Sequence, residues 1–182
     1  VSVRRRPHVL IVPTGDELLD WQTTPLEQLR PGQAVESNAY LLGALVEAAG
    51  GRYTRHALLP DDPERIQRAV AEGVGNHDLV LTVGGSSAGS EDHARAVVAA
   101  LGEVLVHGVA MMPGKPLLVG EVQGAPVFGI PGYPVSAVIA FEQFVRPMIC
   151  RLLGQPDAEP ARAIVETSRK IPSKLGLEEF LR

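Results

Sequence analysis

The chain of 182 residues, 45% of them hydrophobic and 4% aromatic, is long enough for one domain with an aliphatic core. A net charge of −4 gives no reason to expect a nucleic-acid surface, and a single cysteine excludes an internal disulfide framework. No apolar run approaches the ~18 residues of a membrane span and no secretion signal begins the chain, so we expect a cytoplasmic protein with no membrane association.

Short β-branched runs alternate along the chain with segments of helical periodicity, which predict buried strands and amphipathic helices respectively. The basic run at 4–6 is expected to be a solvated linker. Pro147 falls inside the last helix and should kink or break it. The predicted elements, in chain order, are strand 8–13, loop 16–34, a helix capped by Ser37 or Asn38 and ending at 49, strand 52–59, a helix from Pro63 capped by Asp62, strand 78–84, a helix from about 91 to 101, strands 104–107, 117–122 and 126–130, and helix 134–153.

This alternation predicts an α/β domain with a mostly parallel sheet, helices on both faces and right-handed crossovers. Some of the short strands between 103 and 130 are expected to be antiparallel. In such folds the ligand crevice lies outside the carboxyl ends of the parallel strands. The turns that follow Pro13, Gly84 and Ile130 lie at those ends, so we expect them to converge.

Four turns carry the residues from which a site could be built. They combine small residues with hydroxyls, carboxylates and one ammonium, and turns of this kind can expose backbone N–H groups. That chemistry suits a phosphorylated or oxyanionic ligand held with a divalent metal. The turns are Thr14-Gly15-Asp16-Glu17, Gly84-Gly85-Ser86-Ser87-Ala88-Gly89, Pro113-Gly114-Lys115-Pro116 and Ile130-Pro131-Gly132-Tyr133-Pro134-Val135-Ser136.

Three acidic residues, Glu17, Asp61 and Asp92, each fall just after a predicted strand. Glu17 is also explained as part of a turn and Asp92 as a charge that suits a helix dipole, whereas Asp61 has no purely structural role once Asp62 is the helix cap. Three carboxylates at one crevice edge would repel one another unless a hard cation such as Mg²⁺ lay among them. Their shared placement therefore favours a metal site.

The other two turns offer groups that could bind an anion. Lys115 lies in a stiff loop between two prolines, although a lysine is more commonly just exposed. Ser136 falls in the first turn of a helix, where a hydroxyl and free N–H groups can bind an oxyanion. The glycine turn from Gly84 has neither Walker nor dinucleotide spacing, and no Ser-His-Asp arrangement indicates a hydrolase.

Taken together, these segments resemble the molybdenum cofactor biosynthesis domain of the molybdopterin molybdenumtransferase family. The resemblance covers nearly all of 8–154, in order and at sensible spacing. Its most specific elements are the TGDE, PGKP and PGYPVS turns. The matching segments are VLIVPTGDEL at 9–18, ESNAYLLGALVEAAG at 36–50, LLPDDPE at 58–64, LVLTVGGSSAGSED at 79–92, MMPGKPL at 111–117 and GIPGYPVSAVIAFEQFVRPMI at 129–149.

The resemblance implies a three-layer α/β/α fold whose crevice binds molybdopterin, or its adenylylated form, and molybdate as substrates, with Mg²⁺. It implies catalytic roles for Glu17, Asp61, Asp92 and Lys115, with Glu17 and Asp92 as the metal ligands. The cofactor-binding residues that it implies are Thr14, Gly15, Gly84, Gly85, Ser87, Gly89, Pro113, Gly114, Pro131, Gly132 and Ser136.

The resemblance also implies a domain organisation. Residues 1–160 would form the molybdopterin-binding domain, and residues 161–182 would begin a carboxyl-terminal β-barrel, as in an excised fragment of a larger chain. Related domains form dimers or trimers, so a homo-oligomer that binds a small-molecule pterin is expected.

Two departures from the family pattern leave the function open. Family members commonly have Lys where Met112 stands and Asn where Tyr133 stands. The first hypothesis is an enzyme that inserts molybdate into adenylylated molybdopterin. The second is a pterin-sensing module that binds without turnover. The third is a molybdopterin adenylyltransferase, which shares the glycine turn and the acids, although the TGDE, PGKP and PGYPVS segments follow the transferase pattern.

Overall fold

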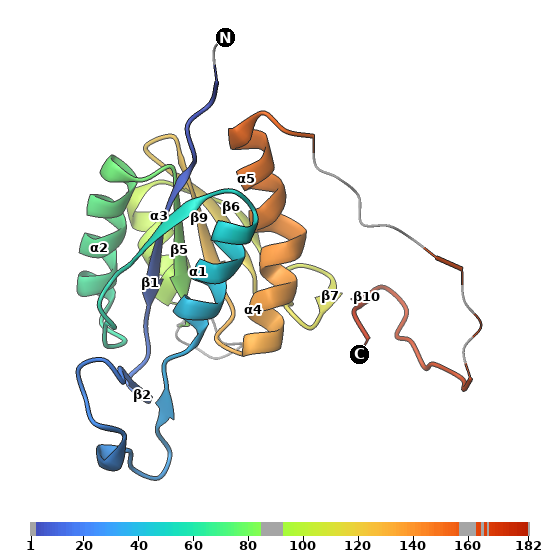
Figure 1. Cartoon of the computed structure of the whole chain (residues 1–182), viewed down its shortest axis with the longest axis horizontal. Coiled ribbons are helices and arrows are strands. Elements are labelled where there is room, and N and C mark those ends of the chain that lie inside the picture. Colours follow the sequence, from blue (N-terminus) through green and yellow to red (C-terminus); the bar gives the residue numbers. More distant parts are fainter. Residues whose placement is uncertain (1–2, 85–92, 157–162, 165, 167, 182) are drawn as a thin grey trace.

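A six-stranded sheet in the order β4-β1-β5-β9-β8-β6 forms the centre of the computed structural model (Figure 1). The structure describes residues 3–84, 93–156, 163–164, 166 and 168–181. The strands of this sheet are β1 (His8–Pro13), β4 (Arg52–Arg55), β5 (Leu79–Val83), β6 (Glu103–His107), β8 (Leu118–Val122) and β9 (Ala125–Ile130). The helices are α1 (Asn38–Ala48), α2 (Pro63–Asn76), α3 (His93–Leu101), α4 (Pro134–Ala140) and α5 (Arg146–Leu153).

The strands pair as the sequence predicts. β1 is parallel to β4 and β5, and β5 is parallel to β9. β8 runs antiparallel to both β9 and β6. The first residue of β8 and the last residue of β6 therefore lie at the same edge as the carboxyl ends of the parallel strands.

Helices cover both faces of the sheet, which confirms the three-layer α/β fold. One core cluster joins α1, α4 and α5 to side chains such as Ile11 and Phe128, which are almost fully buried. A second cluster joins α2 and α3 to the opposite face through side chains such as Val12 and Val80. Strand residues that are apolar on both faces can be buried only in this way.

The two predicted helix caps have different outcomes. Asp62 caps α2, because its Oδ1 accepts the N–H groups of Glu64 (2.9 Å) and Arg65 (3.2 Å). At α1, Ser37 occupies the N-cap position without a capping hydrogen bond from its side chain. The prediction of a Ser37 or Asn38 cap was wrong, because the buried Glu36 carboxylate accepts the N–H of Ala39 at 2.8 Å instead.

Pro147 lies one residue inside α5, and a π-helical turn, Phe141–Val145, joins α4 to α5. A proline has no N–H and crowds the carbonyl four residues earlier, here that of Gln143. The π-helical turn just before Pro147 is wider than an α-helical turn. It therefore accommodates both the missing N–H and the crowded carbonyl without ending the helix. The predicted disturbance of helix 134–153 is therefore a π turn.

Two predicted segments differ in detail from the structure. The loop 16–34 contains a two-residue parallel pair, β2 (Leu18–Leu19) with β3 (Ala34–Val35), and a 3₁₀ turn, η1 (Leu26–Gln28). Figure 1 shows this segment projecting from the body of the domain. The strand predicted at 52–59 ends at Arg55, because regular pairing with β1 stops after that residue. Further along, the N–H of Leu59 bonds to the carbonyl of Pro13 at the end of β1.

The basic run at 4–6 is exposed, as expected of a solvated segment, but its guanidinium groups also bond to the domain. The guanidinium of Arg4 donates to the carbonyl of Leu152, and that of Arg6 donates to the carbonyl of Gly50, each at 3.2 Å. These carbonyls lie at the carboxyl ends of α5 and α1, where cations are favourable. Burial would raise the pKa of Asp78, but hydrogen bonds from Arg5 and the His8 N–H outweigh it and lower that pKa.

The last described segment returns to the domain beside the loop that precedes β8. β10 (Glu178–Glu179) pairs in parallel with β7 (Met111–Met112), and Figure 1 shows the two side by side. The division at residue 160 and the β-barrel expected beyond it stay predictions. In the part of the chain that the structure describes, no helix is both long and apolar enough to cross a membrane.

Candidate functional site

The turns that follow β1, β5 and β9 meet at one edge of the sheet. Gly84 has φ +96°, and a Cβ atom there would lie 2.3 Å from the carbonyl oxygen of Thr14. A Cβ atom on Gly132 would lie 3.6 Å from the Cα atom of Gly84. Thr14 is 2% exposed, because the other two turns pack over it. Only glycine at Gly84 permits this approach.

The backbone N–H groups of these turns are bonded within the fold. The N–H of Thr14 donates to Val83 O at 2.8 Å, and that of Gly84 donates to Ile130 O at 3.2 Å. The N–H of Gly15 donates at 3.1 Å to a carbonyl of the segment after β4. These three groups are therefore not the exposed anion donors that the sequence suggested. The glycines serve close packing of the turns.

The acidic residues of the first turn contact the segment after β4. Asp16 and Asp61 exchange hydrogen bonds, because each carboxylate accepts the other residue's backbone N–H, at 3.2 and 3.3 Å. Asp61 thus has a structural role that the sequence did not reveal. Its Oδ1 is buried without a hydrogen-bond partner among the described residues. The Glu17 side chain folds back toward the turn, where a Cβ on Gly15 would lie 2.7 Å from Oε2.

A cavity of about 340 Å³ opens at this edge, and we call it the crevice. It brings together predicted residues from three different turns. Its walls also include the residues that lead into α1. The lining residues are Pro13, Thr14, Glu17, Leu18, Ala34, Val35, Glu36, Ser37, Asn38, Val83, Gly84, Gly132, Tyr133 and Pro134.

Asn38 is a crevice residue that sequence reasoning missed, since it was interpreted only as a helix cap. Its Nδ2 donates to the carbonyl oxygen of Gly132 at 2.6 Å, which fixes the orientation of the amide. Its Oδ1 is buried and has no hydrogen-bond partner in the described part of the chain. A buried acceptor of this kind is costly unless a ligand or water completes it.

The start of α4 forms the next part of this edge. Ser136 is 9% exposed and lies in the first turn, where helix geometry leaves N–H groups without helical partners. Tyr133 precedes the helix, is 81% exposed and makes no capping hydrogen bond. Pro131 is buried between β9 and this helix.

Lys115 lies on the same edge, beyond β9. Because Leu118 pairs with Gly129, the chain just before Leu118 lies level with the end of β9. The Lys115 side chain is exposed, while Gly114 is buried at φ +111°. Pro113 and Gly114 complete the turn, which does not line the crevice itself.

Four predicted site residues, Gly85, Ser87, Gly89 and Asp92, lie outside the described residues. Within 3–84, 93–156 and the described carboxyl-terminal residues, no three His, Cys, Asp or Glu side chains group closely enough to hold a metal. Mg²⁺ is commonly held by one or two carboxylates together with water and substrate phosphates. Glu17 lines the crevice, whereas Asp61, whose Oδ1 has no partner among the described residues, is not one of its lining residues.

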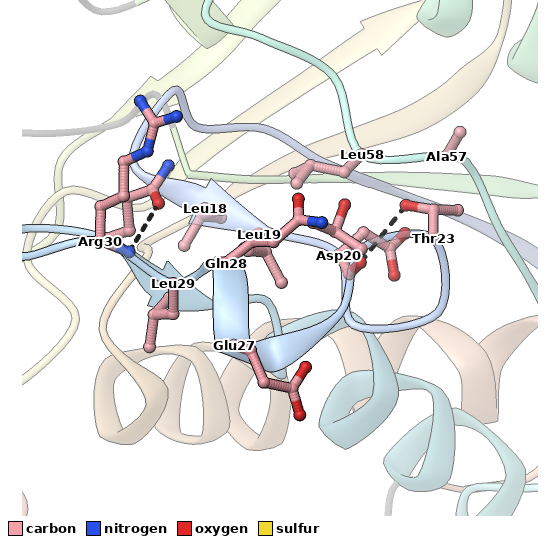
Figure 2. Close-up of a pocket in the computed structure, with 12 residues that line it drawn as sticks. Leu18, Leu19, Asp20, Thr23, Glu27, Gln28, Leu29, Arg30, Ala57 and Leu58 are labelled. Carbon is pink, nitrogen blue, oxygen red and sulfur yellow. Dashed lines mark hydrogen bonds between the residues drawn. The ribbon is translucent and has the colours of Figure 1, made fainter.

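A larger hollow of about 790 Å³ lies under the projecting 18–33 segment, facing Ala57 and Leu58 (Figure 2). Leu18 lines both this hollow and the crevice. The larger hollow is lined by none of the residues that the sequence predicted, whereas the crevice is lined by Thr14, Glu17, Gly84 and Gly132. The crevice is therefore the candidate site.

A buried ion-pair cluster holds the wall of the crevice, and the sequence did not predict it. Arg55 on β4 binds Asp20 at 2.8 Å and Glu36 at 3.0 Å. Its guanidinium also lies 4.9 Å from the centre of the Tyr40 ring. Burial opposes the charge of Arg55, but the two carboxylates outweigh it and raise its pKa. Burial raises the pKa of Tyr40.

The fold and the crevice together define a class of protein. A three-layer α/β fold with a crevice at the carboxyl edge of its parallel strands is typical of domains that bind small molecules. Comparison with known proteins identifies the family within this class. Residues 10–151 match the family model described as "probable molybdopterin binding domain". The chain belongs to this family of molybdenum cofactor biosynthesis domains.

Individual relatives agree with the family. The chain is 38% identical over 158 residues to the molybdopterin molybdenumtransferase of a Nostoc species, covering 85% of this chain and 35% of that protein. It is 32% identical to the solved molybdopterin biosynthesis protein of Pyrococcus horikoshii, with a TM-score of 0.75 over 96% of this chain and 40% of that one. The chain therefore spans less than half the length of these relatives. A structure named molybdenum cofactor biosynthesis protein B shares the fold, at 22% identity and a TM-score of 0.63 over 84% of this chain and 97% of that one.

Proposed function

We propose that the crevice binds adenylylated molybdopterin and supports insertion of molybdate into its dithiolene. The observation that carries this proposal is the contact of three turns, Thr14, Gly84 and Gly132, beneath the unpartnered amide oxygen of Asn38. A ring N–H of a pterin is a donor of the kind that a buried amide oxygen needs. Relatives that share most of this chain are named molybdopterin molybdenumtransferase.

The other groups along this edge suit the anionic parts of the substrates. Lys115 and the first turn of α4 with Ser136 would hold the molybdate oxyanion. Glu17, with Asp92, would hold Mg²⁺ on the phosphates, and Asp61 would add its unpartnered oxygen. Bound Mg²⁺ would offset the charge that develops when water cleaves the phosphoanhydride and AMP leaves. The two dithiolene thiols would then bond to molybdenum, and their two protons would go to one oxo ligand of molybdate, which leaves as water.

The main alternative is a module that binds the pterin without turnover. One observation supports it: Met112 stands where family members commonly have Lys, and it leaves a 41% exposed apolar side chain in the loop that carries Lys115. A molybdopterin adenylyltransferase is the third hypothesis, and the fold is shared with a structure named molybdenum cofactor biosynthesis protein B. The three hypotheses differ in the product that they form, so a product assay separates them.

The test supplies adenylylated molybdopterin, molybdate and Mg²⁺ to the chain and to Glu17→Ala, and measures AMP release and cofactor formation. Glu17→Ala should lower turnover at least about 100-fold, because it removes a metal ligand and changes little of the crevice wall. Glu27→Ala removes an exposed acid of the projecting segment and is the matched control. Turnover that survives Glu17→Ala would contradict the assigned role. Binding without any turnover in the unmodified chain would favour the non-catalytic module.

A further inference from the structure

The loop that carries Lys115 is folded by contacts among its own residues. The N–H of Gly108 donates to Leu117 O at 2.8 Å, and the N–H of Val109 donates to Lys115 O at 2.9 Å. Met111 is 4% exposed and packs under Gly114, where a Cβ would lie 2.4 Å from its Cε. The outer edge of this loop is β7, which lies outside the six-stranded sheet.

A segment far along the chain covers that edge. The N–H of Glu178 donates to Ala110 O and the N–H of Phe180 donates to Met112 O, both at 2.9 Å. Ala110 and Met112 lie on the arm of the loop that leads to Lys115. β10 therefore forms hydrogen bonds to the edge of the loop that the loop's own internal hydrogen bonds do not use.

β10 is anchored to the domain by Phe180, the residue that follows it. The Phe180 side chain packs against the core cluster of the α1 and α4 face. Before the strand, the Glu179 carboxylate accepts the N–H of Lys174 at 3.0 Å and closes a turn. A strand that is held against the core by the residue after it, and preceded by a closed turn, can restrict the loop to which it is bonded.

We propose that β10 is a clamp that positions Lys115 for its anionic ligand. This inference rests on the proposed role of Lys115 as an oxyanion ligand. A lysine side chain is flexible, so the backbone that carries it must be fixed if the ammonium is to bind without a further ordering cost. Glu178 and Phe180 are positioning residues in this account, since they act through backbone hydrogen bonds to the loop.

Glu178 offers a matched pair of variants because its side chain is exposed. Glu178→Pro removes the N–H that bonds to Ala110, whereas Glu178→Ala removes the same carboxylate and keeps that N–H. Two quantities are measured in the full chain: amide hydrogen exchange at Val109, and the affinity for sodium molybdate by calorimetry. Lys115→Ala gives the affinity expected when the ammonium is lost altogether.

Glu178→Pro should speed exchange at Val109 about tenfold and weaken molybdate binding at least about threefold, while core amides such as that of Leu81 keep their protection. Glu178→Ala should stay within about twofold of the unmodified chain in both measurements. Unchanged exchange at Val109 in Glu178→Pro would overturn the clamp. Faster exchange with unchanged molybdate affinity would overturn its link to Lys115.

Absence of molybdate binding by the unmodified chain would refute the proposed role of Lys115, and with it the function assigned to the clamp. The exchange measurement would still decide whether β10 orders the loop. Failure of the proposed function and failure of the clamp are therefore distinguishable.

Discussion

At the scale of single residues, the candidate site depends on a glycine, which has no Cβ atom. Gly84 has no side chain, and this lets the turn after β5 lie directly on the carbonyl of Thr14. The same turn then leaves room for Gly132. The shape of the crevice therefore follows from the lack of a Cβ atom at one position as much as from any polar side chain.

Gly84→Ala should destabilise the domain by about 2 kcal/mol or more, because a Cβ would lie 2.3 Å from Thr14 O at a positive φ. For a chain of this length the melting temperature should fall by about 5 °C or more. Gly75→Ala is the control, since a Cβ there meets nothing within 4 Å and α2 should gain about 0.5–1 kcal/mol. Thermal denaturation measures both. Equal stability of the two variants would contradict the packing described at Gly84.

Single residues were predicted from the sequence where their partner lies nearby in the chain. Asp62 caps a helix that begins at the next residue, so its role could be predicted. Asn38 bonds to Gly132, 94 positions away, and a local pattern contains no information on such a partner. The Asp16–Asp61 exchange was missed for the same reason.

At the scale of elements, the wall of the crevice is held by charge. The segment from β2 to β3 carries Asp20 at one end and Glu36 just beyond the other, and both carboxylates bind Arg55 on β4. Glu36 also caps α1. One guanidinium thus ties the projecting segment, a strand and the start of a helix together.

Arg55→Ala should cost about 3–5 kcal/mol of folding stability, because it leaves the buried carboxylates of Glu36 and Asp20 without a cation. Arg52→Ala on the same strand removes an exposed guanidinium and should change stability by no more than about 0.5 kcal/mol. Urea denaturation of the two variants gives the comparison. A loss in Arg55→Ala as small as that in Arg52→Ala would show that the cluster contributes little.

Strands and helices with clear periodicity were predicted, since burial on one or both faces imposes that pattern. The two-residue strands β7 and β10 were not, because two residues carry no period and their pairing depends on chain segments far apart. Strand 52–59 was predicted too long because the apolar Leu58 and Leu59 extend the pattern beyond the ladder.

At the scale of the whole molecule, strand order determines where chemistry can occur. Parallel β1, β5 and β9 end at one edge, and antiparallel β8 and β6 bring the Lys115 loop to that edge as well. The convergence of the turns after β1, β5 and β9 followed from the predicted alternation of strands and helices, whereas the position of the Lys115 loop depended on an antiparallel pairing that was not assigned to particular strands. The full set of side chains that line the crevice did not follow, because both ends of the 16–34 segment contribute to its wall and no periodicity specifies how that segment folds.

The measurement that tests the account most directly is calorimetric titration of adenylylated molybdopterin, with Mg²⁺, into the chain and into Asn38→Leu. Asn38→Leu keeps the branching and number of side-chain heavy atoms and removes both the unpartnered acceptor and the Nδ2 donor to Gly132, and its melting temperature verifies that it is folded. We predict one-site binding to the unmodified chain, weakened at least about tenfold in Asn38→Leu. No binding to the folded chain, or equal binding to both proteins, would contradict a pterin site in the crevice.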